Sequence, residues 1–130
     1  MISVTTKSPY ALRALVELAR AGAEAPVPVG ELARRADVPA QFLEQLFAVL
    51  RRAGLLRSQR GVKGGYAFAS DPARVTVLEI VELLDGPFGA GSESVFTEAA
   101  DAARTVLAGV SVADVVQREA RAAGAGMYQI

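Results

Sequence analysis

The sequence predicts a mainly α-helical fold that carries one small β-hairpin. Apolar residues recur every three or four positions along most of the chain, which is the spacing of helices with one buried face. Residues 55–59 and 66–69 are instead short segments separated by a glycine-rich loop, as in an antiparallel hairpin. A hydrophobic fraction of 52% in 130 residues indicates a domain with its own core and excludes wholesale disorder.

Three amphipathic helices are expected before the hairpin. They cover residues 10–22, 29–36 and 40–54, with a break at residues 37–39 between the second and the third. The residues expected on their buried faces are Leu12, Leu15, Val16 and Ala19 in the first helix, Val29, Leu32, Ala33 and Ala36 in the second, and Leu43, Leu46, Phe47 and Leu50 in the third.

The order of these elements predicts a winged helix-turn-helix. Two helices joined by a tight turn, the second followed by a two-stranded hairpin, are typical of that DNA-binding unit. Arg60 and Lys63 would then lie on the wing, within reach of a phosphate backbone or a minor groove. A glycine-rich loop can also bind nucleotide phosphates, but this one lacks the GxxxxGK[ST] pattern and does not open a helix.

The distribution of charge supports a nucleic-acid partner although the net charge is zero. Residues 1–74 carry 11 Lys and Arg against 6 Asp and Glu, whereas residues 75–130 carry 3 against 8. A single surface Arg or Lys is more often solvated than bound to a partner. The stretch 34–63, however, holds seven cations against two anions, a clustering that electrostatic binding to DNA requires. These cations are Arg34, Arg35, Arg51, Arg52, Arg57, Arg60 and Lys63.

Three further helices are expected after the hairpin. Residues 75–86 form the first, capped by Thr76 with Glu79, and Ser111 with Asp114 forms a capping box for the last, residues 111–120. Between them, residues 92–107 place a stripe of apolar and small side chains on one helix face. This stripe, which consists of Phe96, Ala99, Ala103 and Val106, packs either on its own domain or on a second copy of the chain.

The composition excludes several classes of function. The chain has no Cys and no His, so it lacks disulfides, the commonest soft-metal ligands and the usual nucleophile and base pairs of hydrolases. No convergent acid, base or nucleophile is visible, and we expect neither an enzyme nor a bound cofactor. The N-terminus lacks the apolar core of a signal peptide, and no apolar run reaches 18 residues. We therefore expect a soluble cytoplasmic protein.

Two segments of the chain resemble a known family. SPYALRALVELA and FLEQLFAVLRRAGLLRSQRGVKGGYAFA are similar to the Rrf-two family of bacterial winged-helix transcriptional regulators, with matches spread over the first 86 residues. The family includes repressors of iron–sulfur cluster assembly and of cysteine metabolism, and this chain most resembles the cysteine-free members that control cysteine metabolism. The matching residues are Tyr10, Ala11, Leu43, Glu44, Gln45, Ala53, Gly54, Leu55, Arg60, Gly61, Gly64, Gly65 and Tyr66.

The resemblance implies a DNA-binding domain over residues 1–86, then a sensor-type loop, a dimerisation helix and a tail over residues 87–130. The start of the recognition helix faces the major groove, and a family arginine in the wing enters the minor groove. The expected DNA-binding residues are Ala40, Gln41, Glu44 and Gln45 toward base edges, Phe42 near the sugar-phosphate edge, and Arg51, Arg60, Gly61 and Lys63. The stripe of Phe96, Ala99, Ala103 and Val106 becomes the dimer interface, as a protein that reads a palindromic operator needs a two-fold partner.

The predicted sensor segment departs from the cluster-binding relatives. Those relatives place three cysteines in the loop after the fourth helix, whereas the corresponding PFGAGSESVF has none. Because iron–sulfur clusters require thiolates, we expect no cluster. The prediction is a homodimeric repressor of cysteine or sulfur metabolism genes. Two alternatives stay open: a repressor controlled by a small ligand near residues 84–96, and a protein-interaction module whose DNA contacts have decayed.

The end of the chain suggests one more partner. Gly124 to Gly126 are expected to form a flexible linker before Met127, Tyr128, Gln129 and Ile130. The cysteine-metabolism repressor ends similarly, and the resemblance implies that cysteine synthase binds the final isoleucine in its active-site cleft. A carboxylate beside an aliphatic side chain imitates an amino-acid substrate and can be captured by backbone amides. The alternative is an ordinary frayed terminus.

Overall fold

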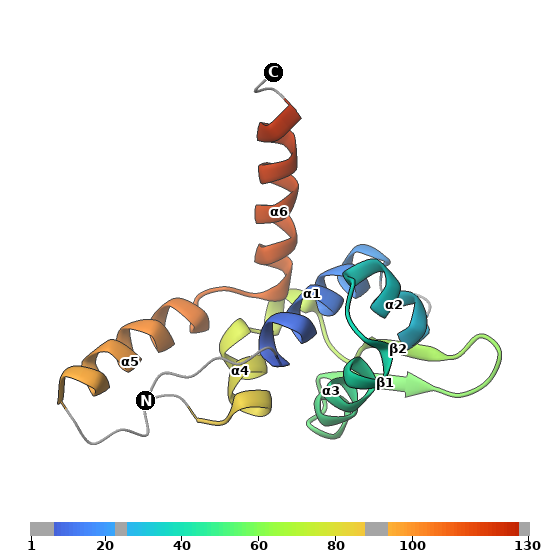
Figure 1. Ribbon diagram of the computed structural model, residues 1–130, viewed down its shortest axis with the longest axis horizontal. Coiled ribbons are helices and arrows are strands. Elements are labelled where there is room, and N and C mark those ends of the chain that lie inside the picture. Colours follow the sequence, from blue (N-terminus) through green and yellow to red (C-terminus); the bar gives the residue numbers. More distant parts are fainter. Residues whose placement is uncertain (1–6, 23–25, 88–93, 128–130) are drawn as a thin grey trace.

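The computed structural model describes residues 7–22, 26–87 and 94–127. Within these ranges the chain is mainly helical and carries one two-stranded antiparallel sheet, which confirms the predicted fold class (Figure 1). The elements are α1 (Lys7–Arg20), α2 (Val29–Ala36), α3 (Ala40–Arg52), β1 (Leu56–Gln59), β2 (Gly65–Phe68), the short 3-10 helix η1 (Pro72–Arg74), α4 (Val77–Asp85), α5 (Ser94–Ala108) and α6 (Val112–Met127).

The core forms where α1 meets α2, α3, α4 and the hairpin. The four predicted core residues of α3 are all buried, and Phe47 among them meets the Tyr66 ring of β2 edge to face, with centroids 5.3 Å apart. In α1 the buried face differs in part from the one expected. Leu12 and Ala19 are only half-buried, while Leu18 is buried, because α1 is central and contacts neighbours on several sides.

The hairpin is anchored to the loop before α2. Leu56 pairs with Phe68 and Gln59 with Gly65, and Val27 extends the sheet by exchanging two 2.8 Å backbone hydrogen bonds with Tyr66. At Gly65, φ is +145°, and a Cβ would lie 2.3 Å from the Val27 carbonyl carbon and oxygen. Only glycine fits this close approach, so the wing has a defined position relative to α2.

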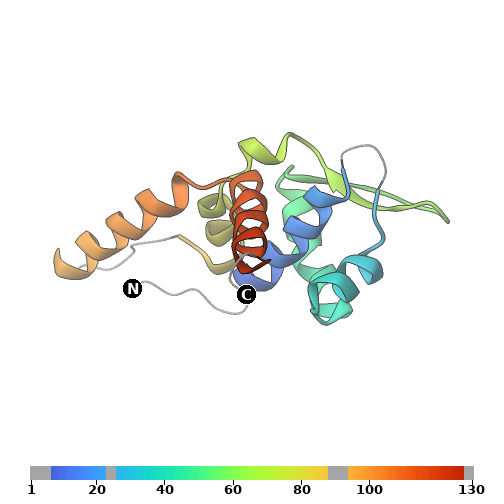
Figure 2. The ribbon, with the colours of Figure 1, turned by 90° about the horizontal axis from the view of Figure 1, so that it is seen from above.

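The last two helices project from this core in different directions. Figure 1 shows α6 standing upright over α1, and Figure 2 shows α5 and the hairpin extending from opposite ends of the molecule. The two predicted capping boxes are confirmed: Thr76 with Glu79 begins α4, and Ser111 with Asp114 begins α6 through two 3.0 Å hydrogen bonds. None of the helices in the described ranges is both long and apolar enough to span a bilayer.

The C-terminal helix α6 bears on two expectations, the flexible linker at residues 124–126 and the domain boundary after residue 86. The expected linker at Gly124 to Gly126 is wrong, because α6 continues through these residues to Met127. Propagating a helix that already has a capped start is easy, so two glycines at about 1 kcal/mol each do not end an alanine-rich segment. Val112 is buried in the main core, and its N–H donates to the Val75 carbonyl at 2.9 Å. The expected domain boundary after residue 86 stays a prediction.

Candidate nucleic-acid interface

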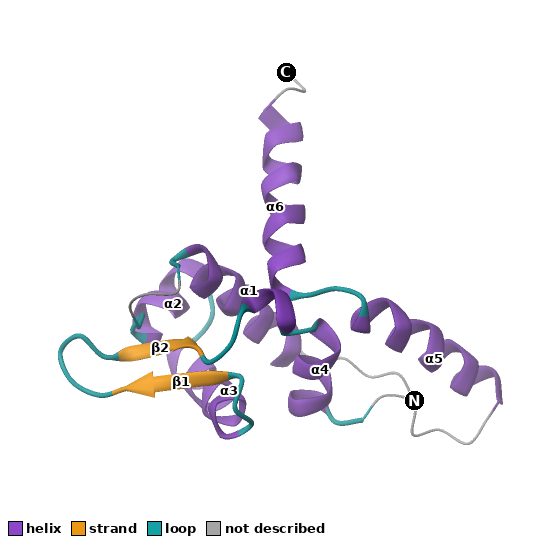
Figure 3. Cartoon of the chain, turned by 180° about the vertical axis from the view of Figure 1, so that it is seen from behind, coloured by secondary structure: helices purple, strands orange, loops and turns teal. Residues whose placement is uncertain are grey.

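The helix-turn-helix is formed by α2 and α3. Asp37 ends α2 with φ 56° and ψ 55°, a left-handed conformation that Asp tolerates better than most residues, and Val38 donates to the Ala33 carbonyl at 3.0 Å. Pro39 then precedes the first residue of α3, where a proline cannot interrupt the helix. The predicted break at residues 37–39 is therefore confirmed, and Figure 3 shows α3 directly beside the hairpin.

The recognition helix presents a polar face to solvent. Its apolar residues pack toward α1, α2, α4 and β1, so the remaining positions of each turn point outward. The exposed residues of α3 are Ala40, Gln41, Glu44, Gln45, Arg51 and Arg52. Five of the predicted contact residues, Ala40, Gln41, Glu44, Gln45 and Arg51, are therefore accessible to a partner.

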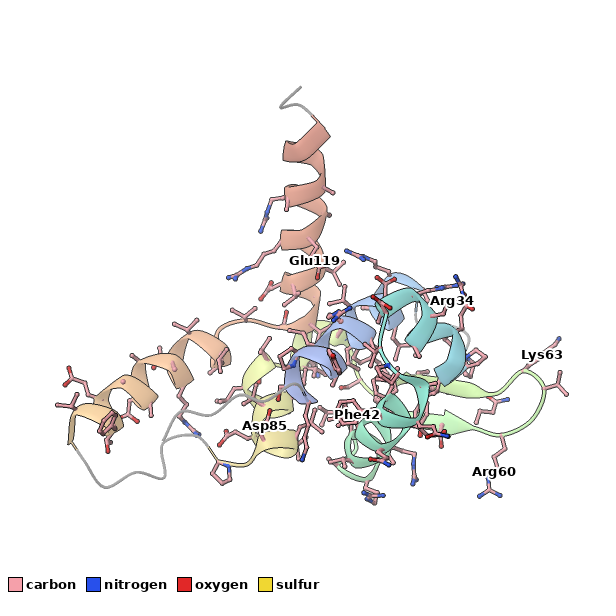
Figure 4. The ribbon with its side chains drawn as sticks, in the orientation of Figure 1. Arg34, Phe42, Arg60, Lys63, Asp85 and Glu119 are labelled. Carbon is pink, nitrogen blue, oxygen red and sulfur yellow. The ribbon has the colours of Figure 1, made fainter. Side chains whose placement is uncertain are left out.

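A groove between α3 and the wing brings several predicted contact residues together. It has a volume of about 760 Å³ and is lined by Glu44 and Arg51 of α3 and by Arg60 and Gly61 of the wing. In Figure 4, Arg60 projects from the wing on the side where α3 lies, and Lys63 extends from its tip. Gly64 shapes this tip, since a Cβ there would lie 2.2 Å from the Gln59 carbonyl oxygen.

The seven predicted cations do not share one environment. Glu31 accepts hydrogen bonds from Arg34 at 2.5 Å and from Arg35 at 2.8 Å, and these contacts lower the pKa of its carboxyl group. The charge of α2 is thus partly neutralised by its own acid. Within the described ranges, no ion pair involves the other five cations, which are Arg51, Arg52, Arg57, Arg60 and Lys63. Uncompensated positive charge therefore concentrates on α3 and the wing.

Phe42 and Gln45 lie on a different side of α3. Phe42 is half-buried, and its ring meets the Tyr10 ring edge to face, with centroids 5.7 Å apart and planes at 79°. Both residues line a recess of about 160 Å³ that also includes Leu83 of α4. The structure gives Phe42 a packing contact with α1, and its expected approach to a sugar-phosphate edge stays a prediction.

Arg13 is a residue that the sequence analysis did not single out. It lies on α1, and its guanidinium donates to the carbonyl oxygens of Ala36 and Asp37 in the turn between α2 and α3. The apolar periodicity of the first helix did not predict a role for it, because Arg13 lies outside the apolar stripe of that helix. The signal available in the sequence was a cation three residues after the aromatic Tyr10, a spacing that places both on one helix face.

Comparison with known proteins agrees with this geometry. Residues 4–118 match the model of the Rrf2 family, described as an iron-dependent transcriptional regulator. The chain belongs to the Rrf2 family of transcriptional regulators. The expected family membership is thereby confirmed. The relatives that the chain matches are transcriptional regulators and not enzymes.

Two curated relatives illustrate how far the similarity extends. This Rrf2-family chain is 37% identical over 86 residues to the helix-turn-helix regulator CymR of Bacillus subtilis, covering 66% of this chain and 62% of that protein. It is 38% identical over 82 residues to IscR of Xenorhabdus nematophila, covering 63% of this chain and 50% of that protein. The match therefore spans only part of each relative's length.

Solved structures share the fold over most of the chain. The structure of CymR, the global cysteine regulator of B. subtilis, superposes with a TM-score of 0.83 and 30% identity, covering 91% of this chain and 98% of that one. IscR of T. potens superposes with a TM-score of 0.79 and 34% identity, covering 91% and 88%. The winged-helix fold of DNA-binding regulators is thus confirmed for this chain.

The iron implied by the family description does not fit the residues of this chain. Iron–sulfur clusters are held by cysteine thiolates, with histidine as the commonest substitute, and the sequence contains neither residue. Among the residues that the structure describes, no three Asp or Glu side chains gather as a metal site either. The side chains of this sequence therefore do not fit a bound iron–sulfur cluster.

Several expected functional segments fall partly or wholly outside the described residues. The predicted sensor loop and ligand position include residues 88–93, and the predicted tail includes Tyr128, Gln129 and Ile130, all of which lie outside them. The predicted interface stripe is described. In α5, Phe96, Ala99 and Val106 are exposed and Ala103 is half-buried.

Proposed function

We propose that this Rrf2-family protein binds a specific palindromic operator as a homodimer and represses genes of cysteine or sulfur metabolism without an iron–sulfur cluster. The single observation that carries DNA binding is the groove shared by α3 and the wing, where Glu44 lies with Arg51 and Arg60. The arginines supply attraction to phosphates, while a carboxylate repels phosphates and can accept a hydrogen bond from a cytosine amino group. Such a combination favours discrimination between sequences over affinity alone.

The exposed apolar face of α5 supports the homodimer. Val95, Phe96 and Val106 are 71%, 62% and 64% exposed in the single chain. Large apolar side chains that gather on one projecting helix mark an interaction surface more often than isolated ones do. A second copy is the occupant that fits, because two-fold symmetry of the protein matches two half-sites spaced by about one turn of DNA, roughly 34 Å.

The class of regulated genes rests on similarity alone. The relative that superposes with a TM-score of 0.83 is described as the global cysteine regulator of its organism. The absence of Cys and His from this chain favours a signal other than a bound cluster. A regulator of the same fold controlled by a small ligand is the alternative.

The test of the proposed function is selection of DNA sequences by the purified protein. We expect an enriched palindrome, and we expect Glu44→Ala to relax the preference at one base pair of each half-site, by about 1–3 kcal/mol. Glu119→Ala is the matched control, because it removes an exposed glutamate of α6 that does not line the groove, and it should leave the base profile unchanged. An unchanged base profile for Glu44→Ala would refute its role in specificity, and no enrichment at all would refute the proposed function.

The C-terminal residues carry a separate proposal about a partner. The predicted tail of Met127, Tyr128, Gln129 and Ile130 would dock into cysteine synthase and link repression to the supply of the cysteine precursor. The motivating feature is the aliphatic side chain of Ile130, since burying an Ile side chain contributes about 1.5–3 kcal/mol. Calorimetric titration of the synthase with the 130-residue chain and with a version lacking Ile130 tests the idea. Equal binding by both, or binding by neither, would refute it.

A further inference from the structure

Arg13, a residue of α1, forms hydrogen bonds to the turn between α2 and α3. Its Nη2 atom donates to the Ala36 carbonyl oxygen at 2.5 Å and to the Asp37 carbonyl oxygen at 3.2 Å. These carbonyls lie at the C-terminal end of α2, where helix carbonyls lack partners within the helix and the helix dipole attracts a cation. One side chain of α1 therefore supplies the hydrogen bonds that α2 cannot supply for itself.

The turn has a geometry that needs such support. Asp37 is the one residue other than glycine with a positive φ among the described residues, and a left-handed conformation is costly for any residue with a Cβ. Only Val38 and Pro39 separate it from the first residue of α3. Because so few dihedral angles connect the two helices, a change at Asp37 would alter the direction in which α3 leaves the turn.

The same side chain is linked to the start of α3 by aromatic contacts. The Arg13 guanidinium carbon lies 5.5 Å from the centroid of the Tyr10 ring, and the Tyr10 ring meets Phe42 edge to face at 5.7 Å. Phe42 is in the first turn of α3, between Gln41 and Leu43. Arg13 and Tyr10 thus hold both the turn and the first residues of the recognition helix against α1.

We propose that Arg13 is a positioning residue for sequence reading, which sets the orientation of the first turn of α3 without contacting DNA itself. The inference rests on the proposed function, because it concerns the helix that reads the operator. Positioning is favoured over a direct phosphate contact since two backbone carbonyls of the turn and the Tyr10 ring together fix where the Arg13 guanidinium lies. A small rotation of α3 would misplace Gln41 and Glu44, whereas nonspecific attraction of DNA would persist.

The experiment compares Arg13→Ala and Arg13→Lys with Arg20→Ala. Arg20 is an exposed arginine of the same helix that pairs with Glu17 and Glu119 and lies away from the turn, so it controls for the removal of one positive charge. Affinity is measured over a salt series for the selected operator and for random DNA. We expect Arg13→Ala to lower operator affinity about 10- to 100-fold while random-DNA affinity and the salt slope stay unchanged.

The lysine variant separates geometry from charge. Lysine keeps the positive charge but lacks the planar group that spans two carbonyls and lies over a ring. We therefore expect Arg13→Lys to lose operator affinity as well, and Arg20→Ala to retain it. An equal decrease on both DNAs with a salt slope smaller by about one unit would identify a phosphate contact and overturn the inference. Full operator affinity in Arg13→Ala would overturn it too.

A measurement on the free protein makes the result independent of DNA binding. The amide protons of Asp37 and Val38 donate to the carbonyls of Arg34 and Ala33 at 3.4 and 3.0 Å, and their hydrogen exchange reports on the turn. We expect Arg13→Ala to speed their exchange by about tenfold or more, with the amides of the buried Leu50 and Ile80 unchanged. Unchanged exchange at the turn, or equal acceleration throughout the core, would overturn the inference. Failure of the unsubstituted protein to bind any operator would count against the proposed function alone.

Discussion

At the scale of single residues, pairing decides which cations are free to attract DNA. Arg34 and Arg35 share Glu31 as an ion-pair partner, whereas within the described ranges no ion pair involves Arg60 or Lys63. All four look alike in the sequence. The structure therefore distinguishes two kinds of cation. Arg34 and Arg35 pair with an acid of their own helix, whereas the wing cations remain available to attract DNA.

The prediction at this scale compares a wing cation with a paired one. Arg60→Ala and Lys63→Ala should weaken binding to operator and random DNA alike and reduce the salt slope by about one unit for each phosphate that the side chain neutralises. Arg34→Ala is the matched control, because its charge is already opposed by Glu31 at 2.5 Å. Binding measured by fluorescence anisotropy over a salt series decides the matter. An equal reduction of the slope in Arg34→Ala would contradict the distinction.

At the scale of elements, the wing depends on a single close approach of two backbones. Gly65 lies against the Val27 carbonyl, and Val27 is bonded to Tyr66 through both its N–H and its carbonyl. We expect Gly65→Ala to destabilise the protein by about 2 kcal/mol or more, since a Cβ at 2.3 Å must displace the backbone. Urea unfolding measures the effect. Gly30→Ala is the control with open space around its Cβ, and equal stability of the two variants would contradict the expectation.

The start of α6 provides a prediction about pH. Hydrogen bonds from the backbone and the side chain of Ser111 lower the pKa of Asp114, so the capping box is stabilising while the carboxylate is charged. Because the folded pKa lies below the unfolded one, this stabilisation is complete above the unfolded value and disappears as pH falls through the folded value. Melting temperatures from about pH 5 to about pH 2 should fall less for Asp114→Asn, which keeps an acceptor but cannot titrate. Parallel pH profiles would contradict the role of Asp114.

At the scale of the whole molecule, the wing and α5 point away from each other (Figure 2). In the proposed homodimer, this arrangement would leave the α3–wing groove open while the apolar side of α5 contacts the second copy. We expect Phe96→Asp to convert a dimer to a monomer, because it places a charge among apolar side chains. Light scattering after size-exclusion chromatography measures the mass. Val62→Asp is the control, an exposed apolar position on the wing. A monomeric unsubstituted protein would refute the dimer.

The sequence by itself determined the type and order of the main helices and strands and the caps of α4 and α6, but not η1 or the end of α6. Helical periodicity identified the buried residues of α3, the capping boxes of Thr76 and Ser111 identified two helix starts, and the glycines near residue 65 identified the hairpin. These features depend on interactions within a few residues, so local patterns contain them. The family signature in the first 86 residues, likewise a local pattern, was enough to predict the winged-helix fold.

Only the tertiary structure decided which residues act together. Arg13 is far in sequence from the turn it binds, Val27 is far from Tyr66, and Gln45 differs from Glu44 by the side of α3 that it occupies. The helical state of Gly124 also escaped prediction, because propensity favours a break there and the preceding capped helix overrides it. Contacts between distant segments and the cooperativity of a helix are properties of the folded chain, and no local pattern of residues encodes them.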